Sequence, residues 1–339
     1  MLIQRLCTLD DLEQIERLAL ASPVGITSLP ADRERLSVMI EGTEAAMDED
    51  VVFTGEERYF FVLEDVASGE LVGCSSIISA AGFSQPFYTF RNEMFVHASR
   101  ELGLHNRIHV LSLCHDLTGH SLLTGFYLTP AWRSDAALRL NACGRLLFAA
   151  SHPQRFADSI AVEVSGISDE EGGSPFWEGV CRHFFDVDYA EAERLGSSLG
   201  RSVLAELLPG YPLYVPMLPD AAQEAIGQVR PASQRVYDIL MAEGFESDNY
   251  IDIVDGGPVV QAHTAELSTV RDSQLARVQI GKPPPATGNW LVANVRVRDF
   301  RACLAPLAWT PGEPVLLDEQ TAGLLKVADG DSLRLIGVR

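Results

Sequence analysis

The chain has 339 residues, of which 47% are hydrophobic, so it is long enough for two domains and can bury a substantial core. Its formal net charge of −21 disfavours binding to nucleic acid or to an anionic membrane surface. The six cysteines are widely spaced without a CxxC or Cys/His ligand pattern, which argues against a zinc site and for a reducing compartment. No long apolar run and no signal-peptide pattern is present, so the sequence predicts a cytoplasmic protein that does not bind membranes.

The N-terminal part of the chain predicts a strand, a pair of helices and a strand pair. Residues 2–6 predict a short strand. Residues 8–22 predict a helix, because Thr8 suits an N-cap and apolar residues recur at helical spacing. A second helix is expected over 30–47. Residues 59–82 predict strand, turn and strand, since two apolar runs flank the turn residues Ala-Ser-Gly-Glu.

The middle of the chain continues with strands and single helices. A proline-rich stretch, residues 205–219, is expected to be irregular or short-stranded. The order of elements is α+β rather than a regular alternation of strands and helices. The expected strands lie at 87–99, 106–116, 120–130, 158–166 and 250–257, and the expected helices at 137–152, 175–185 and 231–245.

The pattern of expected elements changes after about residue 265. The connector "IGKPPPATG" is rich in turn residues, and short strands with one small helix follow it. We therefore expect a core domain over 1–265 and a small, barrel-like β-rich domain over 266–339.

The stretch 125–140 carries the pattern of an acyl-CoA site. In the GNAT superfamily, a strand ends in a turn of the form (Arg/Gln)-x-x-Gly-x-(Gly/Ala), and the N–H groups and dipole of the following helix bind the CoA pyrophosphate. Arg133 is present here, but Ala136 and Leu138 stand at the two glycine positions. The stretch is therefore either a CoA-binding turn or an ordinary strand, turn and helix.

Seven stretches of the sequence match one family in order over most of the chain: "GITSLPAD", "YFFVLEDVASGELVGCSSI", "FYTFRNEMFVHASREL", "DLTGHSLLTGFYL", "SDEEGGSPFWEGV", "AELLPGYPLYVPMLPDAAQEAIGQV" and "EGFESDNYIDIVDGGP". On these stretches the chain resembles the arginine N-succinyltransferase family. The best match is to the α-type subunits of arginine/ornithine succinyltransferases.

That resemblance implies a GNAT-like α+β core and an acyltransferase activity in arginine catabolism. Succinyl-CoA would be a cosubstrate, with no permanently bound cofactor, and the acceptor would be the α-amine of L-arginine or of L-ornithine. It also implies a hetero-oligomer with a related β-type subunit, or a homo-oligomer. The alternative is a catalytically weak structural or regulatory α subunit that requires the β-type partner.

Acyl transfer to an amine needs N–H donors for the oxyanion, an acid for the leaving thiolate and a base for the amine. The backbone N–H groups of Gly125 and Phe126 are the predicted donors, and the resemblance implies that Gly125 is the succinyl-CoA-binding position. The family's proton donor is a histidine in a Gly-Gln-Val-His-Pro stretch, which here reads "GQVRP" and ends in Arg230 and Pro231. Arginine stays protonated, so Arg230 can hold an anion but cannot transfer a proton.

Two side chains are candidates for the base. Glu163 alternates with valines on a strand, where a carboxylate is costly unless it is paired or functional, so it is either a base, an amine ligand or a salt-bridged residue. His115 beside Asp116 is a second candidate base or a polar residue at a strand end. The nearby histidines do not have the spacing of metal ligands, and we expect no metal site.

The acceptor is expected to meet two other segments. Thr27 and Ser28 follow the first helix, in a loop that borders the acceptor site in GNAT-like folds. Asp252 is a predicted partner for a guanidinium. A strand ending in an Asp-Gly-Gly turn explains that aspartate nearly as well.

Overall fold

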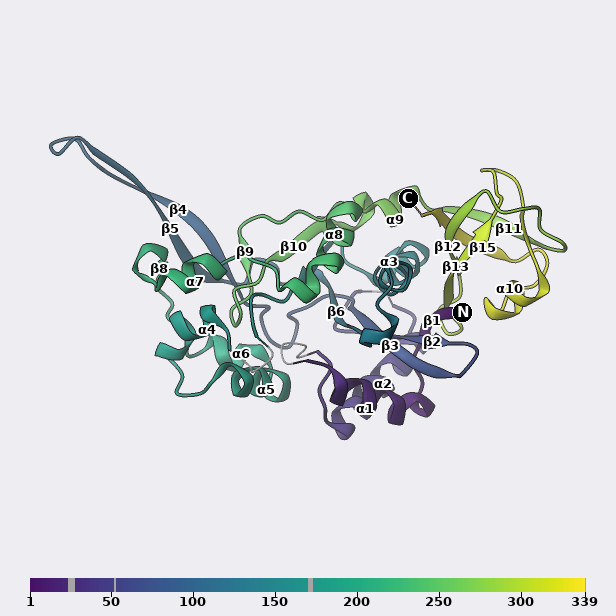
Figure 1. Cartoon of the computed structure of the whole chain (residues 1–339), viewed down its shortest axis with the longest axis horizontal. Helices are drawn as coiled ribbons and strands as arrows, with labels where there is room; N and C mark the ends of the chain where they lie inside the picture. Colours follow the sequence, from purple (N-terminus) through teal and green to yellow (C-terminus); the bar gives the residue numbers. More distant parts are fainter. Residues whose placement is uncertain (24–27, 52, 170–172, 339) are drawn as a thin grey trace.

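The computed structural model describes residues 1–23, 28–51, 53–169 and 173–338, and it is shown in Figure 1. The strands are β1 (Leu2–Leu6), β2 (Arg58–Asp65), β3 (Glu70–Ile78), β4 (Thr89–Ser99), β5 (Leu104–Cys114), β6 (Ser121–Leu128), β7 (Ser159–Glu163), β8 (Leu213–Tyr214), β9 (Tyr250–Ile251), β10 (Val259–His263), β11 (Gln274–Ile280), β12 (Gly288–Asn294), β13 (Arg301–Leu307), β14 (Val315–Leu317) and β15 (Ser332–Gly337). The α-helices are α1 (Leu12–Ala21), α2 (Arg33–Asp48), α3 (Asp135–Ser151), α4 (Pro175–Gly179), α5 (Tyr189–Leu199), α6 (Arg201–Ala205), α7 (Asp220–Ala225), α8 (Gln234–Glu243), α9 (Ser268–Asp272) and α10 (Glu319–Leu324).

One long mixed sheet runs through the molecule in the order β10-β7-β6-β3-β2-β1-β13-β12-β15-β11-β14. Its first six strands form the core sheet, in which β6 and β7 are parallel and their neighbours antiparallel. The strands after α9 continue this sheet, because β13 pairs with β1. The predicted α+β class, with a β-rich C-terminal part, is confirmed.

Strand β2 shows why the centre of this sheet reads as an uninterrupted apolar run. Phe60 and Val62 point to one face, where they pack with buried residues of α1 and α2. Phe61 and Leu63 point to the other face and pack with Phe148 of α3. Side chains of a strand alternate between the two faces, so a strand covered on both sides must be apolar at every position.

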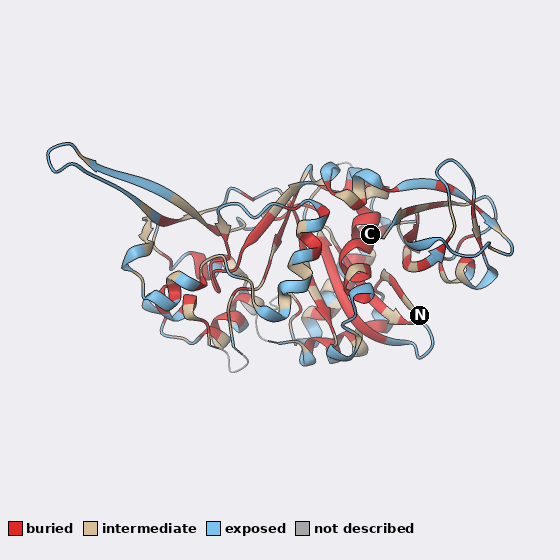
Figure 2. Ribbon diagram, turned by 45° about the horizontal axis from the view of Figure 1, so that its top comes forward, coloured by how far each residue is buried: buried red, intermediate tan, exposed pale blue. Residues whose placement is uncertain are grey.

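A second, four-stranded sheet of order β8-β5-β4-β9 lies beside α4, α5, α6 and α7. Its inner half packs into a separate apolar cluster that includes Phe90, Leu111 and Trp177. The outer half of the β4–β5 hairpin, residues 94–109, projects from the body and is mostly exposed (Figure 2). It carries exposed apolar side chains, among them Met94, Phe95, Val96 and Leu104.

Two expected elements are shorter than the sequence indicates. The helix expected over 175–185 is α4 followed by a separate 3-10 turn. The strand expected over 250–257 ends with β9 at Ile251, so that prediction is wrong beyond this residue. The side chain of Asp252 accepts the N–H groups of Val254 (2.7 Å) and Asp255 (3.1 Å), which turns the chain out of the strand.

Candidate functional site

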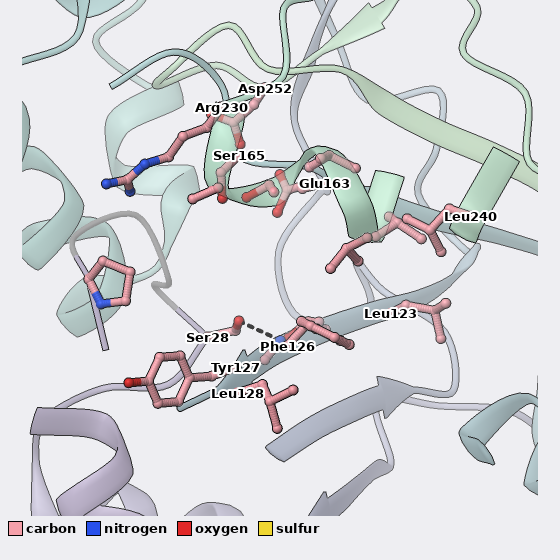
Figure 3. Close-up of a pocket in the computed structure, with 18 of the residues that line it drawn as sticks. Ser28, Leu123, Phe126, Tyr127, Leu128, Glu163, Ser165, Arg230, Leu240 and Asp252 are labelled. Atoms are coloured by element: carbon pink, nitrogen blue, oxygen red, sulfur yellow. Dashed lines mark hydrogen bonds between the residues drawn. The ribbon is translucent and has the colours of Figure 1, made fainter. Parts of the chain in front are cut away.

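A cavity of about 380 Å³ opens between β6 and β7. The two strands pair only from Ser121 to Leu123 with Ile160 to Val162, and their later residues diverge. Figure 3 shows the two walls: Ser28 and the second half of β6 on one side, and Glu163, Ser165, Arg230 and Asp252 on the other. A strand that splays from its parallel neighbour and leads into α3 is the arrangement expected of a GNAT-like core.

The β6 wall contains a bulge at Gly125. The pairing of β3 with β6 shifts register between Cys74 and Ser76, opposite this glycine. Gly125 has φ +62°, and a Cβ atom there would lie 3.2 Å from the Ser76 hydroxyl, so the position favours glycine. Its N–H donates to the Oγ of Ser28 at 2.8 Å. Because Ser28 lines the cavity, this N–H is directed toward it.

Two polar side chains of α3 donate hydrogen bonds to the backbone around the bulge. Asn141 and Arg145 are four residues apart and therefore lie on one face of the helix. Their hydrogen bonds are Asn141 Nδ2 to Cys74 O (3.0 Å) and Tyr127 O (3.2 Å), and Arg145 Nη1 to Ser76 O (2.8 Å) and Thr124 O (3.1 Å). Both side chains are fully buried, so these bonds hold four carbonyl groups on either side of the register shift.

The N-terminus of α3 is capped by Ser134. Its Oγ accepts the N–H of Ala137 (3.3 Å) and its carbonyl accepts the N–H of Leu138 (2.9 Å). The Leu138 side chain is only 6% exposed and packs in the main core, whereas Ala136 is exposed on the first turn. Arg133, just before the cap, lines the cavity at this end.

The opposite wall is acidic and is organised around Arg201 of α6. The Arg201 Nη1 donates to Glu163 Oε1 at 2.7 Å and to a carboxylate oxygen of Asp252. Asp255 accepts two backbone N–H groups and also lines the cavity. Burial lowers the pKa of Arg201, but attraction to Glu163 and other buried carboxylates outweighs that effect and raises the pKa overall. Arg201 therefore stays cationic.

Glu193 of α5 adds a further carboxyl group close to this wall. It is 4% exposed, and its Oε2 has no hydrogen-bond partner among the described residues. Burial raises the pKa of Glu193 to about 7, and burial also raises the pKa of Asp255. With Glu163 and Asp252, four carboxyl groups lie around the guanidinium of Arg201, and Arg230 lies on the same wall (Figure 3), so carboxyl groups outnumber the guanidinium groups there.

The cavity brings together most of the residues that the sequence predicts for the site: Ser28, Gly125, Phe126, Arg133, Glu163, Arg230 and Asp252. Thr27 lies outside the described residues. Ala136 and Leu138 are absent from the lining as the described residues define it. So is His115, which is exposed beyond the end of β5 with its ring against Tyr88.

Sequence reasoning missed Arg145, Glu193 and Arg201. Arg145 had a signal, since it is the one charged residue in the apolar run "NACGRLLFAA" of α3. Arg201 had none, because its partners Glu163 and Asp252 are 38 and 51 residues away in the sequence. Only the folded chain brings these groups together.

The described part of the chain has neither a metal cluster nor a membrane-spanning helix. No group of three or more His, Cys, Asp or Glu side chains there is placed to hold a metal ion. None of the helices in the same residues is long and apolar enough to cross a membrane.

Comparison with known proteins gives matches over the full length. Residues 2–269 match the family described as arginine N-succinyltransferase beta subunit, and residues 274–337 match the C-terminal domain of the same family. The chain is 56% identical to the arginine N-succinyltransferase subunit alpha of Pseudomonas aeruginosa over 338 residues, which is 100% of both chains. It is 36% identical to subunit beta of the same organism, over 99% of this chain and 98% of the relative.

Other relatives of this chain carry the same activity in their names. The arginine N-succinyltransferase of Yersinia enterocolitica is 38% identical over 97% of this chain and 95% of its own length. The solved structure of arginine/ornithine succinyltransferase subunit AI from Pseudomonas aeruginosa superimposes with a TM-score of 0.92 at 54% identity, covering 100% of this chain and 99% of that one. As the matching stretches of the sequence predict, the chain belongs to the arginine N-succinyltransferase family.

Proposed function

We propose that the cavity between β6 and β7 transfers the succinyl group of succinyl-CoA to the α-amine of L-arginine, with L-ornithine as a second acceptor. Membership of the family supports the reaction, and the relatives carry the name of this activity. The observation that carries the assignment is the contrast between the two walls. Backbone N–H groups, Arg133 and Arg145 suit an acyl-CoA on one side, and the carboxylates clustered around Arg201 suit a cationic amino acid on the other.

On the donor side, Gly125 and Phe126 are proposed to donate their N–H groups to the thioester oxygen as it becomes an oxyanion. The Gly125 N–H now donates to Ser28 Oγ, so the thioester oxygen would take the place of that hydroxyl. Arg133 and the first turn of α3, with Ala136, lie toward the CoA phosphates. The side chain of Leu138 supports that turn from the core.

On the acceptor side, Glu163 is proposed to bind the amine or to remove its proton, since only the neutral amine attacks a thioester. Asp252 lines the cavity but is 2% exposed and already bonds to Arg201 and to two backbone N–H groups, so it is proposed to attract a cationic acceptor through its charge. The amine nitrogen then forms a bond to the carbonyl carbon and loses its extra proton to water, the tetrahedral intermediate collapses, and CoA leaves as a thiolate. No covalent enzyme intermediate is required.

Arg230 occupies the position of the family's proton donor. A guanidinium cannot protonate the thiolate at neutral pH, so Arg230 is proposed to hold an anion instead: a phosphate, the oxyanion or a carboxylate. Proton transfer to the thiolate then falls to water. Glu163 is the base we favour, because His115 is outside the cavity lining.

A second candidate function is a catalytically weak subunit that depends on a related β-type partner. The replaced glycines at Ala136 and Leu138 and the replaced histidine at Arg230 favour it. The surface we assign to that contact is the outer half of the β4–β5 hairpin, residues 94–109. In the described structure residues 94–109 pair only with each other. An isolated hairpin with exposed apolar side chains is marginally stable in water.

The test is release of CoA thiol from succinyl-CoA by the purified chain, with arginine or ornithine, alone and mixed with a β-type partner. We expect Glu163→Gln to lower kcat/KM by about 10²- to 10⁴-fold, as for loss of a general base. Asp248→Asn is the matched control, because Asp248 is exposed and bonds to Gln261 outside the cavity lining.

The outcomes separate the two functions. Succinylation of arginine by the chain alone, at a rate that the partner does not raise, would exclude partner dependence. Turnover only in the mixture, lost when residues 94–109 are replaced by a short turn, would support the second function and the hairpin contact. The proposal of succinyl transfer fails if neither preparation acylates arginine or ornithine.

A further inference from the structure

Arg145 is a fully buried guanidinium at the edge of the cavity. It is 1% exposed, and it lines the cavity below the Gly125 bulge. Its Nε donates to Ala142 O at 3.2 Å and its Nη1 donates to the two carbonyl groups of β3 and β6 described above. Its Nη2 has no hydrogen-bond partner among the described residues. Two N–H donors of a charged group are therefore available on the cavity side.

The charge of Arg145 has no anionic counterpart among the residues that the structure describes. Burial lowers its pKa to about 10, so it is still protonated at neutral pH, and no carboxylate contributes to that pKa. Its closest charge-related contact in the described residues is the ring of Phe126, 5.8 Å from Cζ. The half-buried Arg5 and Arg201 bind carboxylates, whereas the buried Arg155, like Arg145, bonds to carbonyl groups, and to the Tyr59 hydroxyl. A buried, unpaired cation favours binding of an anion.

The position of Arg145 along the cavity indicates which anion would bind to it. It lies ten residues after Asp135, or about 15 Å along α3 from the end that faces the CoA phosphates. Its bond to Thr124 O places it next to the proposed oxyanion donor at Gly125, on the side away from those phosphates. An acyl chain whose carbonyl oxygen meets Gly125 N–H extends toward this guanidinium.

We propose that Arg145 is the subsite for the free carboxylate of the succinyl group, and that it selects a dicarboxylic acyl donor over a neutral one. The inference rests on the proposed function and adds the residue that recognises the donor. The succinyl carboxylate lies three carbon–carbon bonds of about 1.5 Å each beyond the thioester carbonyl carbon, and Arg145 is bonded to Thr124 O, next to Gly125 in the chain. A carboxylate there accepts a charge-assisted hydrogen bond from Nη2.

A purely structural role for Arg145, like that of Asn141, makes a different prediction. Loss of support for the bulge would impair every acyl donor equally, because each donor uses the same oxyanion position. Loss of the subsite would impair only donors with a terminal carboxylate. The preference for succinyl-CoA over butyryl-CoA therefore distinguishes the two roles.

The experiment measures kcat/KM for succinyl-CoA and for butyryl-CoA with arginine, using the chain in the form, alone or with its partner, that is active. Arg145→Gln is expected to lower the succinyl-to-butyryl ratio by roughly 10- to 150-fold, as for loss of a hydrogen bond to a charged group. Arg133→Gln is the matched control: it removes an arginine at the other end of the cavity and is expected to affect both donors alike.

An unchanged ratio in Arg145→Gln overturns the inference. If circular dichroism shows that this variant is unfolded, Arg145→Lys decides, because its single nitrogen can replace Nη1 on the two carbonyl groups but supplies no second nitrogen at the Nη2 position. A lowered ratio in Arg145→Lys supports the subsite, and an unchanged ratio overturns it. A wild-type protein without turnover on succinyl-CoA contradicts the proposed function itself, which is a distinguishable result.

Discussion

At the scale of single residues, the acidic wall is set by an imbalance of charge. Arg201 is shared between Glu163 and Asp252, which leaves Asp255 and Glu193 without a full counter-ion. Backbone N–H groups compensate for Asp255, but Glu193 keeps an unbonded carboxylate oxygen among the described residues. Such a wall favours a cationic acceptor. Its buried carboxylates also lower the free energy of unfolding.

The effect of one of these carboxylates on the free energy of unfolding can be measured at Glu193. Its pKa is about 7 in the folded chain and near 4.5 when it is exposed, so the folded state binds the proton more tightly. Its contribution to stability therefore falls as the pH rises from about 4.5 to about 7 and stays low above that range. Glu193→Gln should raise the free energy of unfolding at pH 8 by up to about 3 kcal/mol, with no gain at pH 4. Urea denaturation at the two pH values measures this.

A neighbour on the same helix provides the control. Glu191 is exposed and paired with Arg194, which lowers the pKa of Glu191, so Glu191→Gln should bring no gain at pH 8. A Glu193→Gln variant that is less stable than the wild type at pH 8 would show that the ionised carboxylate is stabilised by Arg201.

The sequence predicts those site residues whose chemistry is unusual for their local context. Gly125 interrupts an apolar strand and Glu163 places a carboxylate in another, and both lie in the cavity. The role of Arg201 could not be predicted, because its partners come from distant segments. Arg145 could have been singled out, since one charge within an apolar helix needs a buried partner or a ligand.

At the scale of elements, the junction of β6 with α3 determines how the turn can meet a phosphate. The Leu138 N–H is used inside the helix and its side chain fills the core, so a glycine there would remove packing as well as change the turn. Asp135 begins the helix with a carboxylate that binds Arg235 of α8 at 2.9 and 2.7 Å. Its negative charge lies at the helix end that would attract a pyrophosphate.

We therefore expect Asp135→Asn to tighten CoA binding, by on the order of 2- to 5-fold, because it removes a like charge and releases Arg235. Calorimetric titration with CoA gives the dissociation constant. Asp220→Asn is the matched control, since Asp220 is also an exposed first-turn acid, on α7, away from the cavity lining. An unchanged dissociation constant for Asp135→Asn would show that this turn does not meet the pyrophosphate.

The elements that the sequence predicts well are those with a long, regular pattern. Strand β2 and helix α3 agree with expectation because burial makes them apolar over many residues. Strand β13 is harder to recognise, because it contains Pro306, and proline inside a run of strand residues usually indicates a break. This proline lies opposite Asn289 near the end of the strand, where a missing N–H is tolerated. Strand β9 ends earlier than its pattern indicates, because the side chain of Asp252 accepts the next backbone N–H groups and turns the chain.

At the scale of the whole molecule, the C-terminal strands share one sheet with the core. Gln4 and Arg5 of β1 pair with β13, so β1 has neighbours on both sides. Phe300, just before β13, packs against Phe61 at 5.7 Å and Phe148 at 5.1 Å between ring centroids. The C-terminal strands also bury an apolar cluster of their own. The domain boundary at 265/266 therefore remains a prediction. It can be tested by asking whether the N-terminal part folds without the C-terminal strands.

A chain that ends at Asp272 is expected to be insoluble or to unfold at a much lower temperature than the full chain. It would expose the edge of β1 to pairing with other chains and leave the site of Phe300 empty, a loss of about 3–5 kcal/mol for that side chain alone. Soluble yield, gel filtration and the unfolding temperature measure the effect. The control replaces residues 94–109 by a short turn, which removes chain that is mostly exposed, and should leave the unfolding temperature within a few degrees of the full chain. A soluble, monomeric 1–272 chain that unfolds cooperatively near the temperature of the full chain would contradict the expectation, because it would show that the core sheet is stable with β1 as its edge.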